Sequence, residues 1–362
     1  MNKLEEARKK INEIDQKMAL LFEERMKASE DVALYKKEHA LPIFDSSREE
    51  EIIKRNSEYI NDSIIKEYYV NFLKNNMNLS KQYQNRLNNG MKIAYSGVEG
   101  AFAHIASMKM FKDATYLSYK DFDSAYEACV NGECDVCVLP IENSVAGEVG
   151  NVMDLMFNGS LYINQVIDLE VNHNLLAKKG ASLKDIKTVT SHSQALSQCS
   201  EYIKKHKLEE IEAVNTAVAA KTVSDGDDYT IASIASIDTA ELYNLEVLER
   251  NINSNRNNTT RFAAFSRNLN LEKTKGIADK HFILVFTVKN EAGSLAQTLN
   301  IIGSYNFNMR ALRSRPMKTL MWNYYFYVEL DGDVNSNDAK EMMKSLEVFC
   351  DRLKLVGTYK TN

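Results

Sequence analysis

Two threonines and an arginine, Thr259, Thr260 and Arg261, stand where a polar stretch turns into an alternating strand-like run, in the sequence RNNTTRFAAFS. In α/β proteins, ligand-binding groups collect at strand ends, where the chain leaves the sheet beside a crevice. A threonine hydroxyl is too weak an acid to ionise, so it can donate a hydrogen bond without titrating. The stretch therefore predicts a hydroxyl donor held rigidly against a small molecule.

The same kind of position recurs earlier in the chain. Short polar residues follow apolar runs in CDVCVLPIENSVAGEVG and TVTSHSQALSQC, and another one begins the helical run NTAVAAK. The residues concerned are Glu142, Asn143, Ser144, Ser191, Gln198 and Thr216. Each of them taken singly could be a helix cap. Their repetition beside strand ends instead favours one shared ligand cleft.

A different chemistry is predicted near the N-terminus, where a long helical pattern carries an apolar seam. Its two heptad positions hold Leu4, Ile11, Met18 and Val32, and Ala7, Ile14, Leu21, Ala28 and Tyr35. Such a seam must be covered by partner helices. Arg25 falls on the seam and Arg8 and Lys36 flank it, and a buried guanidinium requires an anion. Two interpretations are open here: three cations that line an anion site, or one polar residue that sets coiled-coil register beside two solvated neighbours.

A third helical pattern adds hydrogen-bonding groups to this region. One of its faces, at spacings of four and three, carries Leu73, Met77, Ser80, Gln84 and Leu87. Buried Ser and Gln side chains need partners, which favours the anion site. Between the two patterns, SSREEEI predicts a second helix that Ser46 or Ser47 caps, with Arg48 and Glu49 in its first turn.

Several cations, one carboxylate and an amide on such a seam, without a nucleophile or a histidine, suit one kind of chemistry. They can hold a dianion in one conformation and stabilise charge separation without transferring a proton. With these features, residues 1–88 resemble the all-helical chorismate mutases, which rearrange chorismate to prephenate. The family's catalytic residues fall on Arg8, Arg25, Lys36, Glu49 and Gln84, and its substrate-binding residues on Asp45, Arg48 and Ser80.

The resemblance implies a role for each catalytic residue. It implies an intertwined dimer in which Arg8 enters the partner's site, where Arg25 and Arg8 clamp the carboxylates. Lys36 and Gln84 would donate to the ether oxygen as its bond breaks. Glu49 would bind the ring hydroxyl. Such a pericyclic rearrangement requires no acid, no base and no cofactor.

The central region carries a second resemblance. Behind a GVEGAF start, the motifs PIENS, SHSQALSQC, ELYNLEVLE and TTRF resemble those of prephenate dehydratases. That family's fold has two α/β lobes, like a periplasmic binding protein, with the substrate between them. The family's catalytic threonine precedes Arg-Phe, which implies that Thr260 donates to the departing hydroxyl of prephenate. Arg261 and Phe262 would hold the strand in position and line the site. The six polar residues named above would bind the substrate.

One position departs from that family's pattern. Ser193 follows the histidine of SHSQ, where the family usually has proline. The change is expected to alter the rigidity of the turn more than the chemistry, because serine can cap the following helix.

From Lys280 on, strand-like and helical runs follow one another in the order βαββαβ, the ferredoxin-like arrangement. The turn NEAGSLAQTL resembles the first strand-to-helix turn of ACT domains. In the dehydratase family, that turn and an ESRP sequence bind phenylalanine across a dimer interface. The corresponding residues here are Gly293, Ser294 and Leu295, and Arg313, Ser314, Arg315 and Pro316. Arginine in place of glutamate at 313 leaves open which effector binds and whether it inhibits or activates. The alternative is a purely structural dimerisation domain.

The length of 362 residues and the 44% of apolar residues predict several domains with real cores. We expect a helical mutase domain at 1–88, a dehydratase domain at 91–267 and an ACT domain at 280–362. The polar stretch Asn268–Lys280 is expected to be a linker.

Charge and cysteine content exclude other classes of protein. The net charge of −5 without a basic tail argues against nucleic acid as the main partner. No apolar run is long enough to cross a membrane, and the charged N-terminus has no signal-peptide core, so a cytoplasmic protein is expected. Cys134 and Cys137 lie in an apolar run without a second pair, which predicts buried thiols and no metal site.

The sequence thus predicts a bifunctional enzyme that converts chorismate through prephenate to phenylpyruvate, without a metal or an organic cofactor. Phenylalanine is the expected effector, and a homodimer or homotetramer is the expected assembly. One alternative is a non-catalytic sensor made of a binding-protein-like cleft and an ACT domain. Another is a dehydratase whose helical arm has lost mutase activity.

Overall fold

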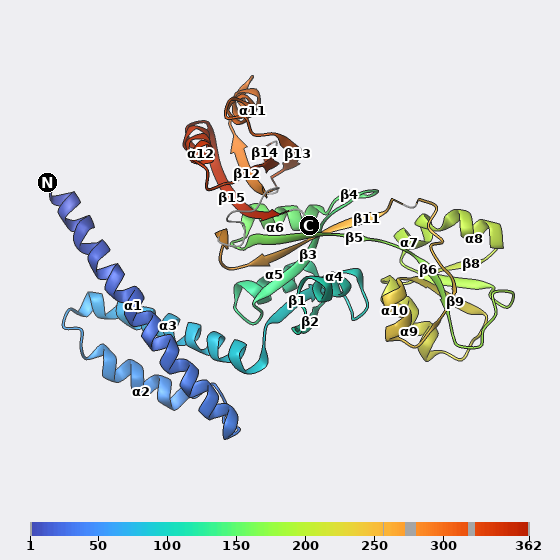
Figure 1. The fold of residues 1–362 in the computed structure, drawn as a ribbon, viewed down its shortest axis with the longest axis horizontal. Helices are drawn as coiled ribbons and strands as arrows, with labels where there is room; N and C mark the ends of the chain where they lie inside the picture. Colours follow the sequence, from blue (N-terminus) through green and yellow to red (C-terminus); the bar gives the residue numbers. More distant parts are fainter. Residues whose placement is uncertain (1, 256, 272–279, 318–322, 361–362) are drawn as a thin grey trace. The chain divides into compact units, whose positions relative to one another are not determined.

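The computed structural model describes residues 2–255, 257–271, 280–317 and 323–360. They fall into two compact units, one ending at Lys92 and the other beginning at Ile93 (Figure 1). Within the described residues, no helix combines the length and the apolar character that crossing a membrane requires.

The first unit is all-helical, as predicted. It consists of α1 (Lys3–Glu38), α2 (Ser46–Ser57) and α3 (Ser63–Asn89). Helix α3 packs against both of the others. The start of α2 differs from the prediction, because Asp45 and not Ser46 or Ser47 is its N-cap. Asp45 immediately precedes the helix and has an extended backbone conformation. Its carboxylate accepts a hydrogen bond from the Arg48 N–H at 3.1 Å.

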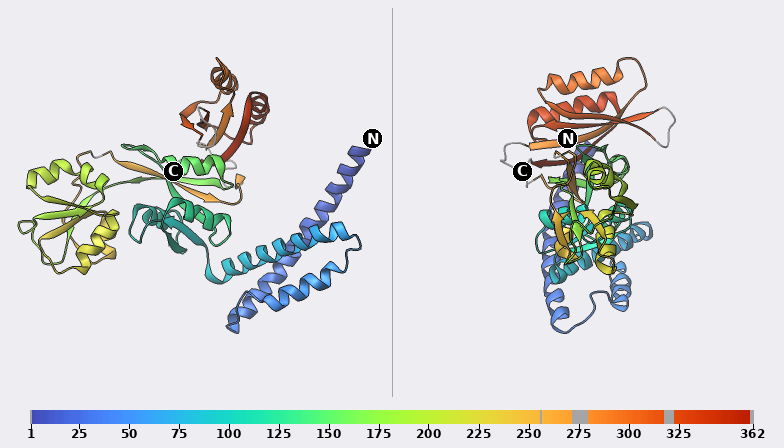
Figure 2. Two further views of the ribbon diagram at one scale, coloured as in Figure 1. Left: turned by 180° about the vertical axis from the view of Figure 1, so that it is seen from behind. Right: turned by 90° about the vertical axis from the view of Figure 1, so that its right-hand side faces the viewer.

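The apolar seam of α1 is largely uncovered within this unit. Its exposed members include Leu4, Ile11, Ile14, Met18, Leu21, Val32 and Tyr35. The N-terminal part of α1 extends past α3 in two views (Figure 2). On α3, in contrast, Leu73, Met77, Ser80 and Gln84 are buried, and only Leu87 of the predicted face is exposed. The buried residues of α1 are Ser29 and Ala33, which do not belong to the predicted seam, so within this unit the apolar seam stays exposed along the length of the helix.

The second unit contains two lobes. The sheet of the first lobe is built from β1 (Lys92–Ser96), β2 (Thr115–Tyr119), β3 (Val136–Asn143), β5 (Tyr162–Glu170) and β11 (Thr259–Ser266). A short strand, β4 (Gly147–Glu148), pairs with β3. Its helices are α4 (Phe102–Met110), α5 (Phe122–Val130) and α6 (Gly150–Asn158). Strand β11 runs antiparallel between β3 and β5. Cys134 and Cys137 are buried, as predicted, although only Cys137 lies within β3.

The second lobe has a separate five-stranded sheet in the order β10-β6-β9-β7-β8. Its strands are β6 (Asn174–Ala177), β7 (Thr188–Ser191), β8 (Glu209–Glu212), β9 (Ile231–Ala235) and β10 (Glu246–Glu249). Its helices are α7 (Ser193–Gln198), α8 (Ser200–His206), α9 (Thr216–Asp225) and α10 (Ile237–Leu242). The chain crosses between the lobes twice, after β5 and before β11 (Figure 1).

The C-terminal elements follow the predicted βαββαβ order. They are β12 (Lys280–Val288), α11 (Ser294–Ser304), β13 (Met309–Pro316), β14 (Tyr324–Asp331), α12 (Asn337–Phe349) and β15 (Cys350–Lys360). Residues 272–279 of the predicted linker lie outside the described residues, and Lys280 already belongs to β12.

The C-terminal sheet is continuous with that of the first lobe. Strand β15 pairs with β5 through Gly357 and Ile163, which joins ten strands of the described chain into one sheet. A Cβ at position 357 would lie 2.2 Å from the Ile163 carbonyl oxygen, so only glycine permits this approach. The regions predicted as two domains, 91–267 and 280–362, therefore share one sheet.

Candidate active sites

A cavity of about 430 Å³ lies at the junction of the two lobes. Of the polar residues predicted to bind substrate, Asn143, Gln198 and Thr216 line it, together with Thr260 and Phe262. Glu142, Ser144, Ser191 and Arg261 are not among the lining residues. The sheet register explains why the first group converges, because β11 pairs with β3 so that Thr260 lies opposite Asn143.

The orientation of the Asn143 amide follows from its backbone contacts. Its Oδ1 accepts hydrogen bonds from the N–H groups of Val145, at 3.0 Å, and Ala146, at 2.9 Å. The other amide atom must then be the nitrogen. This Nδ2 donates to the Thr260 hydroxyl oxygen at 2.8 Å and also to Asn258 Oδ1 at 2.8 Å. Since the Thr260 oxygen accepts this bond, its own hydrogen is left to be donated to a ligand.

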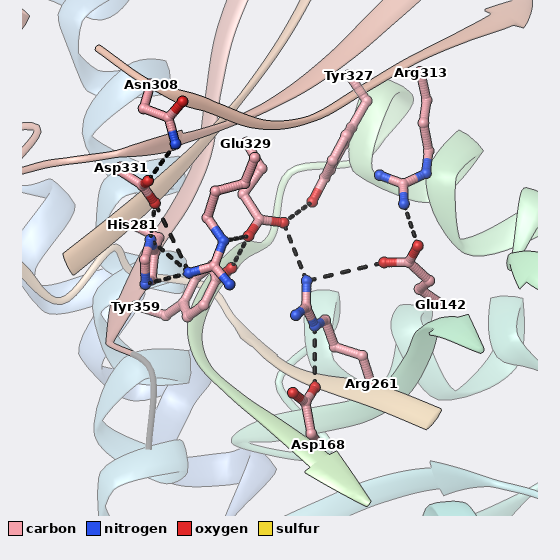
Figure 3. A network of polar contacts seen from close by, with 11 residues as sticks. Glu142, Asp168, Arg261, His281, Asn308, Arg313, Tyr327, Glu329, Asp331 and Tyr359 are labelled. Carbon is pink, nitrogen blue, oxygen red and sulfur yellow. Dashed lines mark hydrogen bonds and ion pairs between the residues drawn. The ribbon is translucent and has the colours of Figure 1, made fainter. Parts of the chain in front are cut away.

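Glu142 and Arg261 belong to a different network, on the other face of the sheet. Successive side chains of a strand point to opposite faces, so Arg261 points away from the side on which Thr260 lies. Its guanidinium contacts Asp168 Oδ1 at 3.1 Å and Glu329 Oε2 at 3.3 Å, and Glu142 pairs with Arg313 (Figure 3). Burial alone would lower the pKa of Arg261, but the hydrogen bond with Asp168 and the charge of Glu329 raise it instead.

Glu329 is the centre of that network and is only 1% exposed. Its carboxylate accepts hydrogen bonds from the hydroxyls of Tyr359, at 2.5 Å, and Tyr327, at 3.3 Å, and lies 3.5 Å from Arg310 Nε. Burial, and then the charge of Glu329, raise the pKa of both tyrosines, which keeps them protonated as donors. The network ties β14 and β15 to β11, one residue away from Thr260 (Figure 3).

Two of the predicted serines hold the chain in place instead of facing the cavity. Ser144 Oγ donates to the Asn257 carbonyl at 2.8 Å and accepts from the Thr259 N–H at 2.9 Å. Ser191 Oγ is buried and donates to the Ile234 carbonyl at 2.6 Å. Ser193 begins α7 and does not cap it: the N-cap is His192, whose Nδ1 accepts from the Gln194 N–H at 3.3 Å.

Among the cavity residues that were not predicted as site residues from the sequence are His173 and Asn258. Asn258 stands just before the Thr260 motif, so the same polar stretch could have indicated it. His173 follows β5 without any motif around it, and only the fold brings it to the cavity.

In the helical unit, Arg25 and Ser80 are in contact across α1 and α3. The Arg25 guanidinium donates to Ser80 Oγ and, at 3.1 Å, to Asn76 Oδ1. Both acceptors are neutral, and no carboxylate pairs with Arg25 among the described residues. Burial lowers the pKa of Arg25, the direction expected for a cation without a counter-ion.

Three other predicted mutase residues, Lys36, Glu49 and Gln84, lie one on each of α1, α2 and α3. Gln84 stands one turn beyond Ser80, is 8% exposed, and its Oε1 has no partner among the described residues. Glu49 pairs with Lys81 at 2.8 Å, and Lys36 Nζ donates to the Ile43 carbonyl at 2.7 Å.

The remaining predicted residues face solvent within this chain. Arg48 pairs with Glu51 at 2.8 Å, and Arg8 is exposed. Arg8 precedes Arg25 by 17 residues on one continuous helix, a distance of about 26 Å along the axis. A single arm therefore cannot bring both guanidinium groups to one small ligand.

Two family models match separate parts of the chain. The model described as chorismate mutase type II matches residues 7–85, and the model described as prephenate dehydratase matches residues 93–270. Bifunctional chorismate mutase/prephenate dehydratase of Buchnera aphidicola subsp. Acyrthosiphon pisum (strain APS) is 30% identical over 97% of this chain and 95% of its own length.

Solved structures are similar to about three quarters of this chain. Prephenate dehydratase from Arthrobacter aurescens, in complex with L-Phe, has a TM-score of 0.68 and 25% identity, covering 75% of this chain and 90% of that one. A structure described as GqqA, a novel type of quorum quenching acylases, has a TM-score of 0.68 and 27% identity, covering 75% and 98%.

The two-lobed α/β unit and its match place this part of the chain in the prephenate dehydratase class, and a chorismate mutase domain precedes it. As a whole, the chain belongs to the bifunctional chorismate mutase/prephenate dehydratase family. It is an enzyme of phenylalanine biosynthesis that rearranges chorismate to prephenate and converts prephenate to phenylpyruvate. The non-catalytic sensor considered above is not supported.

Proposed function

We propose that each of the two reactions has its own site, one in the lobe cavity and one on the helical arm. In the cavity, prephenate loses its ring carboxylate as carbon dioxide, the electron pair moves through the ring, and the ring hydroxyl departs. The observation that supports this placement best is the Asn143–Thr260 hydrogen bond, which orients the Thr260 O–H as a donor. Asn143, Gln198, Thr216 and Phe262 would surround the substrate. Incubating the purified protein with chorismate should yield phenylpyruvate, with prephenate as an intermediate. Unconsumed chorismate would contradict the site on the helical arm, and accumulating prephenate would contradict the site in the lobe cavity.

On the arm, Arg25 would bind a carboxylate of chorismate, since its present partners are neutral. The buried amide of Gln84 would complete its hydrogen bonds on the ligand and, with Lys36, donate to the breaking ether bond. Glu49 would bind the ring hydroxyl, and Asp45, Arg48 and Ser80 would support the site. The rearrangement needs charge placement and one conformation of the substrate, and these residues can provide both.

We propose further that the arm pairs with a second copy, as a homodimer or within a homotetramer. The exposed apolar seam of α1 and the separation of Arg8 from Arg25 both support an arrangement in which Arg8 completes the partner's site.

A cytoplasmic location is also proposed: the five cysteines, all within the described residues, form no disulfide, and thiols persist in reducing compartments.

Mixed dimers test this arrangement. Arg8→Ala and Arg25→Ala subunits should each be inactive as mutases, but in a mixed dimer one site receives an intact Arg25 and an intact Arg8. Random pairing of equal amounts should restore roughly a quarter of the wild-type sites. Mutase rates of the co-refolded mixture measure this, with each variant refolded alone as the control. A mixture no more active than its components would contradict shared sites.

The C-terminal βαββαβ region is proposed to be an ACT domain that binds phenylalanine. Gly293, at a φ of +88°, precedes α11, whose first residues are Ser294 and Leu295, and these form one side of the proposed effector site. The strand carrying Arg313, Ser314 and Arg315 forms the other. The relative from Arthrobacter aurescens was solved with L-Phe. In this chain Arg313 pairs with Glu142, and Arg315 pairs with Asp154 at 3.3 Å. Because Glu142 is the neighbour of Asn143, an effector that displaces Arg313 would change the contacts of the residue next to Asn143.

Arg313→Ala tests this coupling. We expect L-phenylalanine to change the dehydratase rate of the wild type, and the half-maximal phenylalanine concentration to shift by about fivefold or more in the variant, because an ion pair that links the two regions is lost. Arg352→Ala is the matched control, since Arg352 contacts the Phe157 carbonyl instead of Glu142. A flat response in the wild type would favour a purely structural C-terminal domain.

A further inference from the structure

His173, in the crossing between β5 and β6, lines the lobe cavity although no role has been assigned to it above. Its side chain is 2% exposed, and the ring of Phe102 packs edge-on against it at 6.0 Å between centroids. The imidazole Nε2 lies 3.0 Å from Gln198 Oε1. The Nδ1 atom is buried and has no hydrogen-bond partner among the described residues. A buried polar atom in this state is expected to be completed by a ligand.

The hydrogen bonds around the cavity determine which imidazole nitrogen carries the proton. Asn143 Nδ2 donates to Asn258 Oδ1, so the other amide atom of Asn258 is the nitrogen, which donates to Gln198 Oε1 at 2.9 Å. Gln198 Oε1 is thereby an acceptor. The His173 Nε2 that faces it must be protonated, which leaves a lone pair on Nδ1 of the neutral ring. This assignment of donors and acceptors starts from the backbone N–H groups of Val145 and Ala146, which can only donate to Asn143 Oδ1.

A bare acceptor is unusual in a cavity for a dianion, because nearly every polar atom of prephenate is itself an acceptor. The two carboxylates and the ketone only accept hydrogen bonds. The ring hydroxyl is the one group of the dianion that can donate. Burial also lowers the pKa of His173, which favours the neutral ring.

We propose that His173 Nδ1 accepts a hydrogen bond from the ring hydroxyl of prephenate, so that His173 and Thr260 hold the same leaving group from two sides. The hydroxyl hydrogen is then directed to the imidazole, and an oxygen lone pair faces the Thr260 donor. His173 is thus a positioning residue that discriminates the hydroxylated substrate from compounds without that group. This inference rests on the proposed binding of prephenate in the lobe cavity.

Two substitutions separate the two imidazole nitrogens. His173→Gln can keep a donor to Gln198 in the place of Nε2 but has no acceptor in the place of Nδ1. His173→Asn can keep an acceptor in the place of Nδ1 but cannot reach Gln198. The measurements are kcat and KM for prephenate and the inhibition constant of phenylpyruvate, the product, which lacks the ring hydroxyl.

We expect His173→Gln to lower kcat/KM for prephenate by about tenfold or more, with product inhibition unchanged, and His173→Asn to be less impaired. Retained product binding also shows that the cavity is folded. If His173→Asn is the more impaired variant, or if product binding weakens in parallel with kcat/KM, His173 only supports Gln198 and the proposal is wrong. A failure of the proposed function gives a different result. If prephenate does not bind in the lobe cavity, Thr260→Val will leave dehydratase activity intact.

Discussion

Thr260→Val is expected to abolish phenylpyruvate formation while chorismate is still consumed and prephenate accumulates. Valine keeps the volume and the strand preference of threonine, so the substitution removes only the hydroxyl. Asn143 Nδ2 loses an acceptor, and the departing hydroxyl of prephenate loses its donor. Removal of one donor aimed at developing negative charge typically lowers kcat by about 10²–10³-fold. Product analysis after addition of prephenate, and separately of chorismate, measures both activities in one polypeptide.

Two further variants serve as controls for this result. Thr260→Ser retains the hydroxyl and should retain a substantial part of the activity. Thr259→Val changes the neighbouring threonine, which does not line the cavity, and should be nearly neutral. A Thr260→Val enzyme that lost both activities would contradict separate sites, and one with normal dehydratase activity would refute the placement of prephenate beside Thr260.

Arg25→Ala is expected to stop chorismate consumption while added prephenate is still converted to phenylpyruvate. The side chain is partly buried against Ser80 and Asn76, and no other described group neutralises it, so we expect a substrate carboxylate to do so. Loss of one partner of a desolvated charge pair costs about 2–5 kcal/mol, which corresponds to a rate loss of at least about thirtyfold. Arg25→Lys should be impaired as well, because an ammonium group cannot make a two-point contact with a carboxylate.

The control for Arg25 is an arginine of the same helical unit without an assigned role. Arg55→Ala removes an exposed cation from α2 that pairs with Glu51 at 3.7 Å, and it should leave mutase turnover unchanged. Molecular mass in solution shows whether either variant has lost its partner. An Arg25→Ala enzyme of wild-type mass and wild-type mutase turnover would refute the hypothesis that the seam binds an anion.

A large part of this protein could be predicted from local patterns in the sequence. The three helices of the arm, the alternation of strands and helices after residue 91 and the βαββαβ order at the C-terminus follow from hydrophobic periodicity, which local backbone geometry determines. The resemblances to chorismate mutases and to prephenate dehydratases were also correct, because short motifs such as TTRF and PIENS consist of residues that are close together in the chain.

Local patterns were less reliable for individual side chains. Asp45 caps α2 in place of Ser46 or Ser47, and His192 caps α7 in place of Ser193. In both cases several adjacent residues are able to cap, and the backbone conformation at the helix start decides among them.

Local patterns along the chain were thus enough to identify the family, the two reactions, the order of the elements and the hydroxyl donor at Thr260. Which groups contact that hydroxyl depends on how the strands pair. The pairing of β11 with β3 brings Asn143 to Thr260 and sends Glu142 and Arg261 to the opposite face, toward Arg313 and Glu329. These contacts could not be predicted because the partner of a strand is set by long-range packing and register, whereas its periodicity is set by residues close together in the chain.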